Sequence, residues 1–423
     1  MNHFDYRNGV LHAEDVPLTL IAEQVGTPVY VYSQATLERH FQVLNEALAG
    51  TDHLICFAMK ANPSLGVVAT LAAMGAGADV VSEGEARIAM AAGIPAERIV
   101  FSGVGKTEEE LVFALESGIG QLNLESYEEL LELSHLAQRM GKTARIALRV
   151  NPDIDAGTHA KITTGLKENK FGIDWTQAHT VYKQAMRLDG IEVVGVAVHI
   201  GSQLTDLQPF QDAFLRLRDL TLMLQADGIP IQRIDLGGGL GVPYEPGVNE
   251  TPPLPSEYAK VVKSCVGDLG CKLVFEPGRL LVGNAGILLT KIVRLKEGAV
   301  KSFVVVDAGM NDLMRPALYD AYHDIVPVKE PKPGAAKRAV DVVGPICESS
   351  DVFAAGRLLP MLYKGELLAF GTAGAYGASM ASEYNGRPLI PEVMVKGDRF
   401  AVTRARPTYD AMIAAQKLPD WMG

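Results

Sequence analysis

Apolar residues along the chain gather in short runs that alternate with amphipathic stretches. The stretch 126–141 places Leu130, Leu133 and Leu136 at helical spacing, with charged residues on the opposite face. Continuous apolar strands that alternate with helices are typical of a parallel sheet covered by helices. The eight runs are LICFAM (54–59), ADVV (78–81), RIVF (98–101), QLNL (121–124), RIALRV (145–150), VVGVAVHI (193–200), RIDL (233–236) and KLVF (272–275).

Eight such strand–helix units predict an α/β fold, a closed (β/α)8 TIM-like barrel. Polar residues end the runs, and a barrel has its active site at the carboxyl ends of its strands, where side chains from different strands converge. A doubly wound open sheet would also alternate strand and helix, but it does not need functional side chains after every strand. The residues that end the runs are Lys60, Ser82, Ser102, Asn123–Glu125, Arg149–Asn151, His199–Gln203, Gly237–Gly239 and Glu276–Arg279.

The pattern changes after Gly283, where strand-like runs follow one another with few helical stretches between them. Such runs predict a separate antiparallel β domain. The segment before Tyr30 is too short for a domain of its own. We therefore predict an N-terminal segment over 1–30 that packs with the β domain, the barrel over 31–282, and the C-terminal β domain over 283–423. The later runs are ILLTKIVRL, SFVVVDAG, AVDVVGPIC, LLAFGTAG and VMVKGDRFAVT.

Charge and cysteine content narrow the class of protein. Lys+Arg 39 against Asp+Glu 50 gives a net charge of -11, which disfavours nucleic acid and anionic membranes as partners, because both are bound through basic patches. The chain has 4 cysteines, far apart and outside any CxxC pair, so neither a metal site nor a redox motif is indicated.

The sequence also bears on location. The N-terminus carries acidic residues and lacks the apolar core of a signal peptide. Apolar stretches stay shorter than the roughly 18 residues that a membrane span needs. We therefore expect a cytoplasmic protein. The long polar stretch 150–172 could act as a lid.

Two motifs suggest chemistry at the barrel mouth. Lys60 follows the first strand in FAMKANP, where burial would lower its pKa and make it a candidate to form a Schiff base; a strand-end lysine in solvent is the alternative. DLGGGLG (235–241) follows the seventh strand, where barrels commonly bind phosphate, and its glycines let backbone N–H groups approach an anion. A plain tight turn would also explain the glycines.

Three further residues have a structural and a chemical interpretation. Glu276 in FEPGR is either a partner of Arg279 or a hydrogen-bond acceptor for a pyridine nitrogen. His199 in VHIGSQ is either a core histidine or a residue that stacks on a ring. Cys347 in GPICESSD is either an inert buried thiol or a proton donor.

Taken together, these motifs resemble the fold-type III pyridoxal 5'-phosphate (PLP) decarboxylases, and within them the diaminopimelate decarboxylase family. The resemblance covers nearly the whole chain, with the motifs in the family's order. It implies that Lys60 holds PLP, that His199 stacks on the ring and that Glu276 binds the pyridine nitrogen. The other implied cofactor contacts are Asp79, Ser82, Ser202, Gly238, Gly239, Gly278 and Tyr376.

The same resemblance implies the substrate. Arg279, Arg315 and Tyr319 match positions that bind substrate carboxylates, while Glu348 matches the residue that recognises the distal amino group, with Tyr376 nearby. Cys347 would be the proton donor. The implied reaction is decarboxylation of meso-2,6-diaminopimelate to L-lysine and CO2, the last step of lysine biosynthesis. Because the CESSD segment reaches the partner's active site in the family, the resemblance also implies a homodimer with shared active sites.

Other activities on this fold stay open. Decarboxylases of ornithine, arginine or lysine act on substrates without a distal carboxylate, and as the resemblance runs they carry a CDGLD-like segment where this chain has CESSD. Carboxynorspermidine decarboxylase is a further relative. Alanine racemases share the barrel but have no use for CESSD. A cofactor-free regulatory homologue is the non-enzyme alternative, and it would be expected to have lost Lys60, His199 or Cys347.

Overall fold

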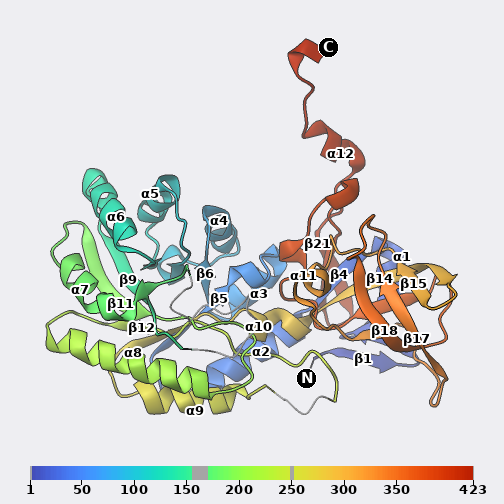
Figure 1. The fold of residues 1–423 in the computed structure, drawn as a ribbon, viewed down its shortest axis with the longest axis horizontal. Coiled ribbons are helices and arrows are strands. Elements are labelled where there is room, and N and C mark those ends of the chain that lie inside the picture. Colours follow the sequence, from blue (N-terminus) through green and yellow to red (C-terminus); the bar gives the residue numbers. More distant parts are fainter. Residues whose placement is uncertain (1, 155–169, 248–251, 423) are drawn as a thin grey trace. The chain divides into compact units, whose positions relative to one another are not determined.

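The computed structural model describes residues 2–154, 170–247 and 252–422, and most of the predicted lid at 150–172 lies outside these ranges. The chain divides into two compact units (Figure 1). The barrel unit comprises Glu38–Pro243 and Val248–Leu281. The sheet unit comprises Met1–Leu37, Tyr244–Gly247 and Val282–Gly423.

Eight parallel strands of the barrel unit close into a ring, which confirms the predicted fold class. The strand order is β9, β11, β12, β13, β5, β6, β7 and β8, and β8 pairs with β9 to close the barrel. A two-residue strand, β10 (Ile173–Asp174), adds to β9. The barrel strands are β5 (His53–Ala58), β6 (Gly77–Val80), β7 (Ile99–Phe101), β8 (Gln121–Leu124), β9 (Ala144–Asn151), β11 (Ile191–Ala197), β12 (Arg233–Asp235) and β13 (Lys272–Phe275).

Helices follow the strands, and polar caps fix where several of them begin. Thr107 and Glu110 form a capping box, in which each side chain accepts a hydrogen bond from the other residue's backbone N–H. In the helix predicted over 126–141, Leu130 and Leu133 are buried as their spacing indicates. The helices are α2 (Gln34–Ala47), α3 (Leu65–Ala73), α4 (Glu83–Ala91), α5 (Glu108–Ser117), α6 (Tyr127–Met140), α7 (Trp175–Ala185), α8 (Gln208–Ala226), α9 (Pro255–Val266) and α10 (Arg279–Val282).

The sheet unit is built on a strand path ordered β18, β17, β15, β14, β4, β20 and β21, with β19 pairing both β14 and β16. Most pairs are antiparallel, as predicted, but β15–β17 and β4–β20 are parallel. The partners in these two pairs are distant in sequence, so no hairpin dictates their direction. The strands are β4 (Val29–Ser33), β14 (Gly286–Glu297), β15 (Ser302–Val306), β16 (Ile325–Pro327), β17 (Lys337–Val343), β18 (Val352–Pro360), β19 (Leu367–Phe370), β20 (Glu392–Lys396) and β21 (Arg399–Arg404).

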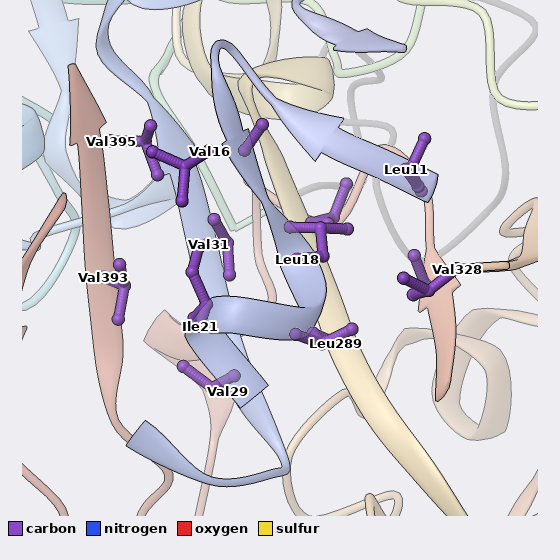
Figure 2. Packing of buried hydrophobic residues seen from close by; sticks show 13 residues of the cluster. Leu11, Val16, Leu18, Ile21, Val29, Val31, Leu289, Val328, Val393 and Val395 are labelled. Atoms are coloured by element: carbon purple, nitrogen blue, oxygen red, sulfur yellow. The ribbon is translucent and has the colours of Figure 1, made fainter. Parts of the chain in front are cut away.

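The N-terminal segment packs on this sheet through an apolar cluster. The N-terminal segment consists of β1 (Phe4–Arg7), β2 (Val10–Ala13), β3 (Val16–Pro17) and α1 (Leu18–Val25). Figure 2 shows the apolar side chains of the N-terminal segment facing those of β4, β14 and β20, and the labelled side chains are all buried. Because β4 pairs with β14 and β20, the sheet unit extends to Leu37, beyond the predicted boundary at residue 30. The labelled members of the cluster are Leu11, Val16, Leu18, Ile21, Val29, Val31, Leu289, Val328, Val393 and Val395.

The remaining helices are short. They include α11 (Arg315–Tyr319) and α12 (Tyr409–Ala414) in the sheet unit, together with several 3-10 turns. Across the described ranges, no helix has the length and apolarity required to cross a membrane. The same ranges contain no cluster of His, Cys, Asp and Glu suited to a metal ion.

Candidate active site

Lys60 lies at the carboxyl end of β5, in the 3-10 turn Met59–Ala61. Its Nζ is 3.2 Å from Asp79 Oδ2 at the end of β6. The Asp79 side chain is fully buried, whereas the Lys60 side chain is 39% exposed. The amine is therefore held by a buried carboxylate and still open to a reactant, which a covalent cofactor lysine requires.

Lys60 lines a cavity of about 300 Å³ at the carboxyl ends of the barrel strands. This is the end of the barrel at which polar strand-end residues are expected to converge. The volume is at the lower limit of small-molecule sites. The cavity is lined by Lys60, Val81, Ser102, Gly103, Asn123, Arg149, Phe171, Ala197, Val198, His199 and Glu276.

Glu276 reaches the cavity from the end of β13 and is buried. Its Oε1 lies 3.3 Å from Asn123 Nδ2 and 3.5 Å from Ser102 Oγ. Burial, together with the nearby carboxyl groups of Asp235 and Asp79, raises the pKa of Glu276 well above its ordinary value, and Lys60 opposes the shift. Glu276 therefore holds a proton more tightly than an ordinary carboxylate does.

Behind Glu276 lies a buried polar network that the sequence interpretation did not assign. Gln121 Nε2 donates to Asn123 Oδ1 at 2.9 Å and to Asp235 Oδ2 at 3.1 Å. Burial raises the pKa of Asp235 to about 6. Asn123 is among the strand-end residues singled out in the sequence, without a role, whereas Asp235 lies inside an apolar strand run. A polar residue facing a barrel interior was the signal that could have identified Asp235.

His199 follows β11 and is partly buried. Gly238 N donates to His199 Nδ1 at 3.2 Å, so the proton of the neutral imidazole lies on Nε2. Burial and the positive charges of Arg149 and Lys60 lower the pKa of His199 well below its ordinary value. The ring is therefore neutral and can pack flat against another ring.

The triple glycine loop after β12 leaves no room for side chains. A Cβ on Gly238 would lie 2.2 Å from Glu276 O, and one on Gly239 would lie 2.5 Å from Gly201 O. Gly237 also has a φ of +63, in the left-handed region. The loop is packed against the ends of neighbouring strands, and it presents backbone rather than side chains, as the predicted phosphate contact requires.

The remaining predicted residues of the barrel unit make specific contacts. Ser202 Oγ accepts a hydrogen bond from Arg279 Nη2 at 3.1 Å, and the carbonyl of Gly278 accepts one from Leu281 N. Ser82 caps α4 by accepting from Glu85 N at 3.2 Å. Its observed contact is therefore with the helix backbone, which explains why a serine follows β6.

In the sheet unit, Arg315 begins α11 and is buried. Its guanidinium lies 4.6 Å from the centre of the Tyr244 ring, and Nη1 lies 2.9 Å from His323 Nε2. These contacts fix the orientation of a buried positive charge before any ligand binds. Tyr319 ends the same short helix.

Cys347 and Glu348 lie on an exposed loop of the sheet unit. Cys347 N donates to Asn385 Oδ1 at 2.8 Å, and Ser350 Oγ donates to Glu348 Oε1 at 2.5 Å. Hydrogen bonds from Ser350 and Tyr384 lower the pKa of Glu348, so this carboxylate stays charged. Cys347 is a free, exposed thiol rather than the inert buried one considered as its alternative.

Asp351 ties that loop to itself and to the segment around Met310. Its Oδ1 accepts from Met310 N and its Oδ2 from Ile346 N, each at 2.7 Å. Tyr376 lies on another loop of the sheet unit with a φ of +55, in the left-handed region. The predicted site residues are thus divided between the units, with Arg315, Tyr319, Cys347, Glu348 and Tyr376 in the sheet unit.

Comparison with known proteins agrees with this chemistry. Residues 34–283 match the family described as pyridoxal-dependent decarboxylase, pyridoxal binding domain. The diaminopimelate decarboxylase of Pseudomonas fluorescens is 51% identical over 419 residues, 99% of each chain. That of Zymomonas mobilis is 47% identical over 422 residues, again 99% of each. The chain belongs to the diaminopimelate decarboxylase family.

Solved structures of this family agree in fold. The diaminopimelate decarboxylase of M. jannaschii, in co-complex with L-lysine, matches with a TM-score of 0.92 and 38% identity over 99% of both chains. The Helicobacter pylori enzyme complexed with L-lysine matches with a TM-score of 0.90 and 41% identity, over 94% of this chain and 98% of that one. As a member of the diaminopimelate decarboxylase family, the chain is a PLP-dependent carboxy-lyase.

The barrel mouth fits that cofactor. Asp79 Oδ1 and Arg149 Nη2 are buried and have no hydrogen-bond partner among the described residues. Such atoms are costly unless a ligand satisfies them. With the amine of Lys60 in the cavity and the glycine loop beside it, the residues present can accommodate an aldehyde, an aromatic ring and a phosphate.

Proposed function

We propose that this chain converts meso-2,6-diaminopimelate to L-lysine and CO2, the last step of lysine biosynthesis. The observation that carries the proposal is the amine of Lys60, held by buried Asp79 in a cavity whose wall includes Glu276. The relatives bound to L-lysine support the choice of substrate, because L-lysine is the product of the proposed reaction.

The barrel residues hold PLP in this proposal. The bound cofactor supplies an electron sink for the electrons left when CO2 departs. Lys60 attaches it covalently, Glu276 faces the ring nitrogen, and His199 packs on the ring as a neutral imidazole. The residues assigned to further cofactor contacts are Asp79, Ser82, Ser202, Gly238, Gly239, Gly278 and Tyr376.

The distal end of the substrate carries a carboxylate and an ammonium group, and each is bound by side chains of the opposite charge. Arg279 and Arg315 can each bind a carboxylate in a bidentate way, with Tyr319 beside it. Glu348 is charged and can pair with the distal ammonium. After CO2 leaves, the Cys347 thiol donates its proton to the substrate carbon.

The proposal includes a homodimer in which each active site is built from both subunits. It also places the protein in the cytoplasm. Cys347 and Glu348 are exposed in the single chain, which leaves them available to a second copy. Mixing inactive Lys60→Ala and Cys347→Ala proteins tests this arrangement. With shared sites and random exchange, roughly a quarter of wild-type activity returns, because each hybrid dimer has one intact site. Activity that stays absent after proven subunit exchange would exclude shared sites.

The test of the reaction is CO2 release by PLP-loaded protein. Meso-diaminopimelate is compared with L-ornithine, L-arginine and L-lysine, and Lys60→Ala is the control. We expect turnover of diaminopimelate alone, lost in the variant. Turnover of ornithine or arginine instead would leave the fold and cofactor standing and refute the roles given to Arg279, Arg315 and Glu348.

A further inference from the structure

The buried network behind Glu276 has no role in the steps described so far. It links Asn123 on β8 with Asp235 at the end of β12. Asn123 Nδ2 lies 3.0 Å from Asp235 Oδ2, 3.3 Å from Glu276 Oε1 and 3.2 Å from Ser102 Oγ. One amide group thus stands between two buried carboxyl groups.

The hydrogen bonds available in this network are too few for two ionised carboxylates. The Asn123 amide carries two protons and faces three acceptors. Asp235 Oδ1 also accepts from Gly237 N at 3.0 Å, and Gln121 Nε2 reaches Asp235 Oδ2 at 3.1 Å. Glu276 Oε1 is reached by Asn123 and by the distant Ser102 hydroxyl. A hydrogen bond between the carboxyl groups of Glu276 and Asp235 also raises the pKa of Glu276 and lowers that of Asp235. A proton on the carboxyl pair supplies the missing donor.

The charges around the pair lead to the same conclusion. Glu276 faces Asp235, Asp79 and Lys60, while Asp79 is already paired with Lys60. Two further buried carboxylates would therefore have little compensating positive charge, and buried groups of like charge do not both ionise readily. Three other groups interact with Asp235. The thiol of Cys56 and the phenol of Tyr258 stay neutral, because burial raises the pKa of each, and Arg233 adds a positive charge that favours ionised Asp235 and a proton on Glu276.

We propose that Asp235 is a positioning residue for Glu276, and that its carboxylate, which shares the Asn123 amide with Glu276 and accepts a hydrogen bond from it, keeps one proton on Glu276 that Glu276 alone would release. The proposal rests on the assignment of Glu276 to the ring nitrogen. When that nitrogen faces Glu276, the proton passes from Oε to the nitrogen, and Glu276 is left as a carboxylate. No proton is taken from solvent. The positive charge on the ring nitrogen offsets the negative charge that Glu276 gains beside ionised Asp235.

A purely structural role is the alternative, because Asp235 also binds the backbone of Gly237. Loss of that contact would loosen the glycine loop and weaken binding of the phosphate, whatever the ring contains. The two roles therefore differ in whether they depend on the ring nitrogen and on pH.

The experiment measures the affinity of the apoprotein for PLP and for an analogue in which carbon replaces the ring nitrogen. Affinities are determined by fluorescence titration across a pH series. In wild type we expect preference for PLP to fall at alkaline pH, when the shared proton is lost. In Asp235→Asn the midpoint of that fall moves to lower pH by about one unit, because a like charge is gone. At pH values between the two midpoints, Asp235→Asn should therefore prefer PLP over the analogue about tenfold less than wild type does.

A charge exchange provides the rescue. The double variant Asn123→Asp with Asp235→Asn restores a carboxylate beside Glu276 and should return the midpoint toward wild type. If Asp235→Asn does not fold, Asp235→Ser replaces it, because a hydroxyl can still accept the Gly237 N–H. A midpoint unchanged in the Asp235 variant, or affinity for both ligands lowered equally, would overturn the proposal.

Glu276→Gln separates this inference from the function on which it rests. We expect this variant to move the midpoint further than Asp235→Asn does. If Glu276→Gln alters the pH profile and the Asp235 variants do not, only the role of Asp235 fails. If Glu276→Gln leaves the profile unchanged, Glu276 does not face the ring nitrogen, and the proposed cofactor contacts fail with it.

Discussion

Glu276 and Asp235 at the mouth of the barrel unit and Glu348 on the exposed loop of the sheet unit have pKa values shifted in opposite directions. At the barrel mouth, burial raises the pKa of Glu276 and Asp235. On the loop, hydrogen bonds from Ser350 and Tyr384 lower the pKa of Glu348. The first environment retains a proton and the second maintains a charge. Chemistry on a ring needs the former, whereas recognition of an ammonium group needs the latter.

The two regions also differ in how their groups are held. Asn123 and Asp235 lie within barrel strands, whose neighbours on both sides fix them. The loop is tied instead by a few hydrogen bonds, such as those that Asp351 accepts from Ile346 N and Met310 N. We therefore expect changes at the barrel mouth to affect cofactor binding, and changes on the loop to affect turnover alone.

Replacement of Lys60 should have the largest effect. Lys60→Ala removes the amine that holds the cofactor, and we expect activity to fall by more than about 10⁴-fold, as for other covalent catalysts. The absorption of lysine-bound PLP should vanish as well. Substantial activity in the variant would show that another amine carries the cofactor. The barrel mouth would then no longer be the region that determines cofactor binding. Lys142→Ala, on the barrel surface, is the control for loss of a lysine.

Cys347→Ala should slow turnover and leave the cofactor bound. Loss of a positioned proton donor lowers kcat by about 10²–10⁴-fold. The affinity for PLP and its absorption should stay as in wild type, because Cys347 lies on the exposed loop. Cys271→Ala serves as the control for removal of a thiol elsewhere. A variant that no longer binds PLP would contradict the separation of cofactor and substrate functions.

Leu289→Ala tests whether the apolar cluster of the sheet unit is needed for stability rather than chemistry. Leu289 is fully buried in that cluster, so the cavity should cost about 2–5 kcal/mol in unfolding free energy. Val293→Ala, on the same strand but 41% exposed, is the matched control and should cost far less. Denaturant unfolding measures both. An equal loss in the two variants would show that the cluster is not the source of stability.

Asp312→Asn should change the pH dependence of stability. Burial raises the pKa of Asp312 in the folded sheet unit to about 6, above its ordinary 3.8. A raised pKa stabilises the fold fully below the ordinary value, and the contribution is lost as the pH rises through about 6. Wild type should therefore lose about 3 kcal/mol relative to the variant across this window. Denaturant unfolding at several pH values measures the difference.

Asp52→Asn is the control for that measurement, because the Asp52 side chain is 73% exposed. Its stability should follow the wild-type pH profile. Parallel profiles for wild type and Asp312→Asn would show that Asp312 ionises normally.

Much of the barrel could be predicted from sequence because burial on both faces leaves continuous apolar runs. All eight runs correspond to strands of the closed barrel. The polar residues that end them also indicated the mouth, including Lys60 and Glu276. What the runs could not reveal was which residues across the barrel meet, such as Asn123 and Asp235, because that depends on strand order and stagger.

The sheet unit was less predictable. Strand β18 (Val352–Pro360) was not anticipated, and its pairing with β17 is irregular around Val340–Val343. Gly356 on β18 also has a φ of +61, which interrupts the alternation expected of a strand. The contacts of Arg315 join the start of α11 to Tyr244 and His323 on two separate loops, and no local sequence pattern indicates such contacts.

The place of β4 in the sheet has a consequence for how the chain is made. Val29–Ser33 emerges early from the ribosome, yet its two neighbours, β14 and β20, lie on the far side of the barrel in sequence. Domains generally fold as they emerge, and closing so long a loop is slow. The barrel unit is nearly continuous in sequence, so it can form while both edges of β4 are still unpaired. During synthesis β4 is therefore exposed to mispairing, and its edges are covered only when β14 and β20 have been translated.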